Sequence, residues 1–362
     1  MDLLTDGINN KVVEKTNFTR KITIDGVTKA YQVWKVRLDQ QFNNDQNDRI
    51  ATWISQYKYE NNKKLDHLEN REEYNDIIEK FIIESNPDAI KKTQNNIELV
   101  DQREAGVVLS DGRIIDGNRR FTCLRRLSSK NDRFKYFEAV ILDHKYENSA
   151  KQIKMLELAI QHGEESKVGY APIDRLVGIY NDIIDTELLT EEEYSRSTNE
   201  PLSEIKKKIC LAKLMVEFLE FINAPKQFHI ARDLQIYSSL EELHTLMNKC
   251  HSEDEKEDYK ICVFNNIIML SSGDVAKFIR SFKNIVGSEY QDVFLEEQRE
   301  LAEKTLERIP TDKRVDASFI RDELREDELT AELQRSTEKA LVKVKKDETR
   351  NRPIQLAEKA TT

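Results

Sequence analysis

Alternating apolar and polar positions mark the start of the chain. Residues 20–24 and 29–36 alternate in this way, and the Asp25-Gly26 pair between them is typical of a hairpin turn. Further apolar runs bounded by turn residues occupy residues 106–110, 113–115 and 137–142. Together these runs predict a small mixed sheet within the first 145 residues.

Apolar residues spaced three and four apart predict helices between these strands. They occupy residues 50–59 and 72–85, and Asn86-Pro87 ends the second helix because proline cannot continue it. The polar residues 88–96 predict a short helix or a loop. From Arg119 the apolar positions follow a helical period, so residues 116–118 are predicted to be the junction where a strand leads into a helix.

Helical periodicity dominates from residue 149 onward. Residues 190–193 read Thr-Glu-Glu-Glu, a capping box that opens a short helix, and residues 198–202 form a turn. Ser203 is then predicted to cap a long helix, which gives a helix-turn-helix layout. Because a recognition helix meets DNA near its N-terminal end, we predict DNA contacts by Ser203, Lys206, Lys207 and Lys208. The alternative is a purely structural helix pair.

The pattern as a whole predicts an α+β domain followed by an all-α region. At 362 residues the chain is long enough for two or three domains. The predicted divisions are an α+β domain (1–147), a helical domain with the helix-turn-helix (148–225), a helical C-terminal domain (226–310) and a charged helical and partly disordered tail (311–362).

The composition favours a folded cytoplasmic protein. Apolar residues make up 38% and charged residues 34%. No apolar run reaches the roughly 20 residues that a membrane helix needs, and the first residues lack a signal-peptide layout. The four cysteines form no Cys-x-x-Cys pair, and the spacing of His244, Cys250, His251 and Cys262 fits no closed zinc site. We therefore predict no membrane partner and no metal-ligating residues.

Charge is unevenly distributed along the chain. The formal net charge is −10, which argues against a protein that coats nucleic acid without specificity. Residues 113–135 nevertheless carry eight Lys or Arg residues against two acids, Asp116 and Asp132. An acidic chain with one concentrated basic segment is typical of a localised anion site.

The junction at residues 116–120 has the chemistry of a phosphate-binding turn. Gly117 permits a tight backbone turn, and the first turn of the following helix presents unpaired N–H groups. Arg119 and Arg120 add bidentate donors suited to phosphate, and Asp116 can orient one of them or coordinate a metal. The alternative is that both arginines are ordinary helix-start residues paired with nearby acids.

Residues 117–123, with the lead-in 107–116, resemble the phosphate-binding box of the ParB/sulfiredoxin superfamily. The match fixes Gly117 and Arg120 and places Cys123 at a small-residue position. In this family the loop holds the triphosphate of a nucleotide, CTP in the chromosome-segregation branch. The resemblance therefore implies nucleotide binding by Asp116, Gly117, Asn118, Arg119 and Arg120, with CTP or another nucleoside triphosphate and Mg as ligands.

The residue after the glycine separates the branches of the superfamily. Sulfiredoxins carry the catalytic cysteine there and the free-serine kinases carry histidines nearby, whereas this chain has Asn118. The resemblance is thus to the ParB branch, and sulfiredoxin activity is not expected.

A second ParB element, led by a glutamate and containing an asparagine, helps to hold Mg and nucleotide on a following helix. At the corresponding place this chain has residues 157–165, in which the asparagine is missing. Glu157 and Gln161 lie one helical turn apart and could substitute, so Glu157 is the candidate catalytic residue and Gln161 a candidate nucleotide contact. Glu164 and Glu165 have the alternative of being solvated charges.

These observations lead to one main expectation and two alternatives. We expect a ParB-like DNA-binding protein in which a bound nucleotide switches DNA or partner binding, with a homodimer or another protein partner held through the C-terminal region. The first alternative is a superfamily enzyme, such as a nucleotide hydrolase, phosphotransferase or nuclease, in a mobile-element or phage-defence setting. The second alternative is a protein-interaction module that kept the fold and lost the ligand.

Overall fold

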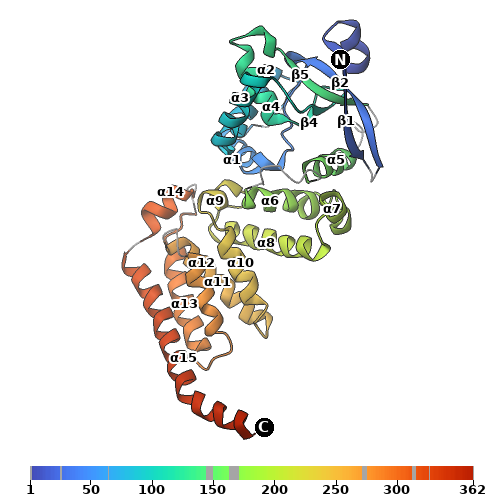
Figure 1. Ribbon diagram of the computed structural model, residues 1–362. Coiled ribbons are helices and arrows are strands. Elements are labelled where there is room, and N and C mark those ends of the chain that lie inside the picture. The colour runs from blue at the N-terminus through green and yellow to red at the C-terminus, as the bar shows by residue number, and fades with distance from the viewer. Residues whose placement is uncertain are drawn as a thin grey trace. The chain divides into compact units, whose positions relative to one another are not determined.

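The computed structural model describes residues 2–24, 27–63, 65–143, 150–162, 171–270, 275–311, 315–325 and 327–361 (Figure 1). The predicted Asp25-Gly26 turn and the Glu164-Glu165 pair lie outside these residues. The chain divides into two compact units, Met1–Ile209 and Cys210–Thr362. The finer division into four parts stays a prediction.

A five-stranded sheet forms the centre of the first unit. Its order is β1-β2-β5-β3-β4, with β3 and β5 parallel and the other neighbours antiparallel. The predicted mixed sheet is therefore confirmed, and the first hairpin is longer than the alternation suggested. The strands are β1 (Val13–Ile24), β2 (Val27–Arg37), β3 (Gly106–Leu109), β4 (Ile114–Asp116) and β5 (Tyr136–Leu142).

Helices form where the apolar period predicted them. They are α1 (Ala51–Asn61), α2 (Arg71–Ser85), α3 (Pro87–Val100), α4 (Asn118–Ser128), α5 (Ala150–His162), α6 (Pro172–Ile179) and α7 (Glu191–Thr198), with short turns η3 (Asp48–Ile50) and η6 (Tyr180–Asp185). The segment near 88–96 is the full helix α3. Pro87 fits its first turn, and the Asn86 side chain accepts a hydrogen bond from the Ala89 N–H at 3.0 Å.

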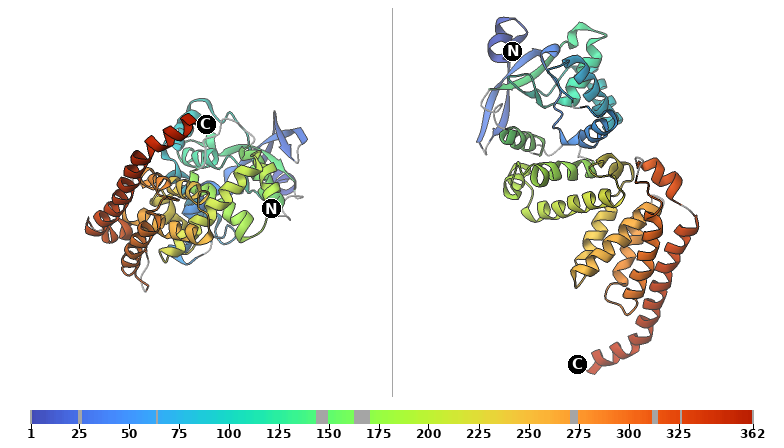
Figure 2. Two further views of the ribbon diagram at one scale, coloured as in Figure 1. Left: turned by 90° about the horizontal axis from the view of Figure 1, so that it is seen from below. Right: turned by 180° about the vertical axis from the view of Figure 1, so that it is seen from behind.

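Both faces of the sheet are covered at its central strand, β5. Phe137, Ala139 and Ile141 of β5 pack into one apolar cluster with α1 to α4. The alternate residues Val140 and Leu142 pack into a second cluster with α5. Successive side chains of a strand point to opposite faces, so the near-continuous apolar run of β5 matches a strand that is covered on both sides. Figure 2 shows α5 beside the β1–β2 hairpin, away from α2, α3 and α4.

Gly117 makes the junction between β4 and α4. Its φ of +101° is in the left-handed region, which residues with a Cβ adopt only with strain. A Cβ at this position would lie 2.7 Å from Cζ of Phe137, whose side chain is fully buried. The predicted strand-to-helix junction is confirmed, and α4 begins at Asn118.

The predicted helix pair is present as α7 and α8 (Leu202–Phe221). Thr190 forms the expected capping box with Glu193. The prediction that Ser203 caps α8 is wrong, because the Pro201 carbonyl already accepts the Ile205 N–H at 3.2 Å. Ser203 therefore lies inside the first turn of the helix.

The second unit contains helices joined by turns and loops, and no strand, among its described residues. Its helices after α8 are α9 (Phe228–Asp233), α10 (Tyr237–Met247), α11 (Glu253–Met269), α12 (Val275–Ser281), α13 (Gln291–Leu306), α14 (Ala317–Phe319) and α15 (Asp327–Thr361). Its core includes Phe282 and Phe294, whose rings meet edge to face. The last residues were expected to be disordered, but α15 continues to Thr361 because Ala, Glu, Lys, Gln and Leu favour helix. Within the described residues, no helix combines the length and apolar character needed to cross a membrane.

Candidate functional site

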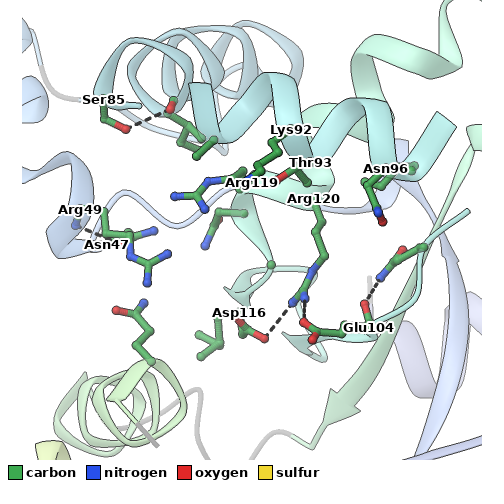
Figure 3. A pocket seen from close by; sticks show the side chains of 18 of the residues that line it. Asn47, Arg49, Ser85, Lys92, Thr93, Asn96, Glu104, Asp116, Arg119 and Arg120 are labelled. Carbon is green, nitrogen blue, oxygen red and sulfur yellow. Dashed lines mark hydrogen bonds and ion pairs between the residues drawn. The ribbon is translucent and has the colours of Figure 1, made fainter. Parts of the chain in front are cut away.

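A cavity of about 590 Å³ opens beside the β4–α4 junction (Figure 3). Its walls come from η3, the end of α2, one face of α3, residues 102–104 and the turn 115–120. Gln161, near the end of α5, completes the wall. The structure thus brings the predicted residues Asp116, Gly117, Asn118, Arg119, Arg120 and Gln161 to one cavity, although α5 is distant in sequence.

Five basic side chains line this cavity, against two acidic ones. The basic residues are Arg49, Lys92, Arg103, Arg119 and Arg120, and the acidic residues are Glu104 and Asp116. Such an excess of positive charge in a concave site attracts an anion. The N-terminus of α4 adds backbone N–H groups and the positive end of the helix dipole.

Arg120 is held by acids of the cavity wall. Its Nη2 lies 3.0 Å from Oδ2 of Asp116 and its Nη1 lies 2.6 Å from Oε2 of Glu104. The same Asp116 oxygen also receives Nη1 of Arg20 at 2.9 Å. The alternative reading of the sequence, an arginine paired with nearby acids, therefore holds for Arg120.

Arg119 is placed differently, although it is the adjacent residue. It is half-buried and forms no ion pair within the described part of the chain. Burial lowers the pKa of Arg119, and the nearby positive charges of Arg49 and Arg120 lower it further. Figure 3 shows Arg49 and Arg119 approaching the cavity from η3 and α4. Two guanidinium groups directed into one cavity are stabilised when an anion lies between them.

The Asn118 side chain is used to fix the turn. Its Oδ1 accepts the Asn44 N–H at 3.1 Å, and its Nδ2 donates to the Ile114 carbonyl at 3.3 Å. Asn118 can therefore offer a ligand its backbone N–H, while its amide holds residues 44 and 114 together. This arrangement explains why an amide is suitable after Gly117, since both its donor and its acceptor are satisfied.

Glu157 lies behind the cavity wall. Its side chain is 1% exposed, and its Oε1 accepts Nε2 of Gln161 at 2.9 Å. Its other oxygen accepts Nδ2 of Asn44 at 3.3 Å. Glu157 does not line the cavity, so the prediction that it acts there as a catalytic residue is not supported by its position. Packing of α5 onto the sheet places Gln161, one turn later, at the cavity instead.

A buried charge cluster adjoins Glu157. Lys154 Nζ lies 2.5 Å from Oδ1 of Asp48 and 3.4 Å from Oδ2 of Asp182, and these three side chains are at most 9% exposed. Burial raises the pKa of Glu157 to about 8; Lys154 opposes this shift, and Asp48 and Asp182 reinforce it. Burial likewise raises the pKa of Asp182 to about 7. Three buried carboxylates around one lysine favour retention of a proton near neutral pH.

The acids of this region do not form an evident metal centre. Asp116 is already shared by two arginines, and Glu157, which does not line the cavity, is bonded to Asn44 and Gln161. Among the residues that the structure describes, no group of three or more His, Cys, Asp or Glu side chains is arranged to hold a metal ion. The positive charge of the cavity wall comes from its arginine and lysine side chains.

The predicted DNA-contacting residues lie at the start of α8. Ser203 and Lys206 are exposed, and Lys207 and Lys208 are half-buried. Lys208 pairs with Glu200, and Lys206 Nζ lies 3.9 Å from Oε2 of Glu191. The lysines are therefore interleaved with acids, and DNA binding here requires phosphates to replace carboxylates as their partners.

Arg49, Lys92 and Arg103 of the cavity were not found from the sequence. Lys92 belongs to a segment predicted as a short helix or a loop, and Arg49 lies at the end of a polar stretch. No spacing rule connects these residues with Arg119, because they come from η3, α3 and the loop after α3.

The chain matches no family model and no curated protein.

Proposed function

We propose that this protein binds a nucleoside triphosphate, or a similar polyphosphate, in the cavity beside the β4–α4 junction. The observation that carries the proposal is the placement of Arg119. This arginine is half-buried in the first turn of α4 and has no acidic partner among the described residues. Arg49 lines the same cavity. An anion there satisfies the guanidinium groups and the backbone N–H groups together.

The size and lining of the cavity support a nucleotide. Cavities that hold small ligands measure about 300 to 1,000 Å³, and this one measures about 590 Å³. Arg49, Lys92 and Arg119 supply positive charge for phosphates. Thr93 and Asn96 of α3 supply uncharged polar groups that suit a sugar or a base. The resemblance of residues 107–123 to the ParB branch favours CTP.

We further propose that the bound nucleotide controls binding of DNA or a protein partner, as in a ParB-like protein. The order of elements supports this proposal, because the α7–α8 pair follows the α+β region and carries three consecutive lysines. The helical second unit is the proposed site of self-association or of a protein partner.

An enzymatic role receives less support from the geometry. A hydrolase or phosphotransferase needs a base that reaches the ligand or a water beside it. Glu157, the candidate for that role, is 1% exposed and bonded to Asn44 and Gln161. We therefore propose nucleotide binding and do not propose turnover.

Calorimetric titration of the whole protein with CTP, ATP, GTP and UTP tests this function. We expect Arg119→Ala to weaken the preferred nucleotide about ten- to a hundredfold, because a charged hydrogen bond contributes about 1.5 to 3 kcal/mol. Arg126→Ala is the matched control, since Arg126 is exposed on the same helix and does not line the cavity. The proposal fails if wild type binds none of the four, or if both variants behave alike.

A further inference from the structure

Gln161 connects the cavity directly to buried Glu157 through one side-chain hydrogen bond. Its Nε2 donates to Glu157, and it is part of the cavity lining. Its Oε1 is buried and has no hydrogen-bond partner in the described part of the chain. Rotation of the amide group by half a turn about the last bond of the side chain exchanges the positions of Nε2 and Oε1. Such a rotation is feasible for Gln161, because only Nε2 is bonded to the carboxylate and Oε1 is unsatisfied.

The orientation of Gln161 depends on whether Glu157 carries a proton. Ionised Glu157 only accepts hydrogen bonds, so it holds Nε2 of Gln161 and leaves Oε1 as the remaining polar atom. Protonated Glu157 can donate to Oε1 of a reversed amide, which frees the Nε2 donors. Asn44 can donate to the other oxygen of Glu157 in both states. An anion in the cavity favours the state in which Glu157 is protonated, because Nε2 of Gln161 is then free to donate to the anion.

The surroundings of Glu157 allow both its ionised and its protonated state to be populated near neutral pH. Burial and the carboxylates of Asp48 (η3) and Asp182 (η6) raise its pKa, while Lys154 on its own helix opposes them. Among the other elements packed against α5, α7 contributes the buried hydroxyl of Tyr194, whose pKa burial also raises. The strand β1 contributes Arg20 and the strand β4 contributes Asp116, and these two side chains form an ion pair with opposite charges.

We propose that Glu157 is a positioning residue that couples binding of a phosphate-bearing ligand to uptake of one proton, through reversal of the Gln161 amide. This inference rests on the proposed function of the cavity. In the unliganded protein at high pH, Gln161 donates to the Glu157 carboxylate. When the anion binds, Glu157 takes a proton from solvent, donates it in a hydrogen bond to Oε1 of Gln161, and Nε2 is released toward the ligand.

Calorimetry with CTP, or with ATP where CTP does not bind, tests the coupling. Titrations between pH 7.5 and 9, in buffers of different ionisation enthalpy, report the number of protons taken up. The terminal phosphate of the nucleotide, with a pKa of about 6, stays ionised over this range. We expect net proton uptake by wild type and an affinity that falls as pH rises, by at most about tenfold per pH unit for one proton.

Two variants and one control identify the group that takes the proton. Glu157→Gln places a donor beside Gln161 at every pH, so we expect no proton uptake and tighter binding than wild type at pH 9. Gln161→Met retains Glu157 but removes the amide, so we expect weaker binding and loss of the uptake. Lys151→Met is the control, because Lys151 lies on the same helix, pairs with Glu193 and forms no hydrogen bond with Gln161; it keeps the uptake.

The outcomes separate this inference from the proposed function. Absence of nucleotide binding by wild type at every pH overturns the proposed function, and the coupling with it. Binding without proton uptake, or uptake that persists in Gln161→Met, overturns the coupling alone. If Glu157→Gln does not fold, Gln161→Met and Lys151→Met still decide the question, because neither replaces Glu157.

Discussion

Arg120 and Asp116 lie one helical turn apart, with Nη2 of the arginine 3.0 Å from Oδ2 of the aspartate. Because Arg20 shares that oxygen and Glu104 holds the other end of the guanidinium, Arg120 forms part of the cavity wall. Its neighbour Arg119 has no such partner in the described chain. Adjacent arginines at the start of α4 therefore differ in their partners, since Arg120 is held by two acids and Arg119 lines the cavity without an acidic partner in the described chain.

Glu104→Gln is expected to strengthen polyphosphate binding. The Glu104 side chain is 69% exposed, so its pair with Arg120 contributes less than about 1 kcal/mol to stability. Its removal takes a negative charge from the cavity and frees Nη1 of Arg120. Titration at low and high salt measures the effect. A gain that disappears at high salt supports the electrostatic explanation, and unchanged affinity at low salt contradicts it.

Gly117→Ala is expected to destabilise the first unit. The left-handed backbone costs a non-glycine residue about 1 to 2 kcal/mol, and displacement of Phe137 adds to this. Denaturant unfolding measures the loss. Gly287→Ala is the control, because its φ is +73° but the nearest atom to an added Cβ is 3.9 Å away. Equal losses in the two variants would show that contact with Phe137 contributes nothing.

Lys154→Met is expected to destabilise the protein by about 3 to 5 kcal/mol at pH 8, because it leaves buried carboxylates without their cation. Burial raises the pKa values of Glu157 to about 8 and Asp182 to about 7, above their unfolded values. The folded state therefore binds more protons, so stability falls as pH rises through these values.

Unfolding of Lys154→Met between pH 5 and 9 checks this sign. The loss of unfolding free energy in Lys154→Met should become smaller as pH falls toward 5, because the carboxyl groups become neutral in the folded state. Lys151→Met is the matched control on the same helix, since its pair with Glu193 is partly exposed and contributes less than about 1 kcal/mol. A Lys154→Met defect that does not change with pH would contradict the assignment of the buried charges.

Reversing the charge of Lys206 and Lys207 together is expected to weaken duplex DNA binding at least about tenfold, because each phosphate contact depends on a basic side chain. Fluorescence anisotropy with and without nucleotide measures this effect. Lys213→Glu on the exposed side of α8 is the control. Unchanged DNA affinity in the double variant would exclude the start of α8 as the DNA-contacting segment.

The sequence by itself determined the local elements. Alternation identified the first hairpin, and apolar runs bounded by turn residues identified the other strands. Apolar spacing identified α1 and α2, and the change to a helical period at Arg119 identified the strand-to-helix junction. These features depend on interactions between residues close in the chain, so their pattern is visible without the fold. The basic segment 113–135 likewise indicated an anion site near Arg119.

Only the tertiary structure decided how the site is assembled. Arg49, Lys92 and Gln161 reach the cavity from η3, α3 and α5, and no sequence period relates these elements. Arg119 and Arg120 differ in their ion pairs, and this difference depends in part on Glu104, which lies on a separate loop and pairs with Arg120. Glu157 is buried because α5 packs on the sheet, whereas its sequence position allowed a surface carboxylate. Long-range packing sets which charges meet, and it therefore sets the chemistry of this site.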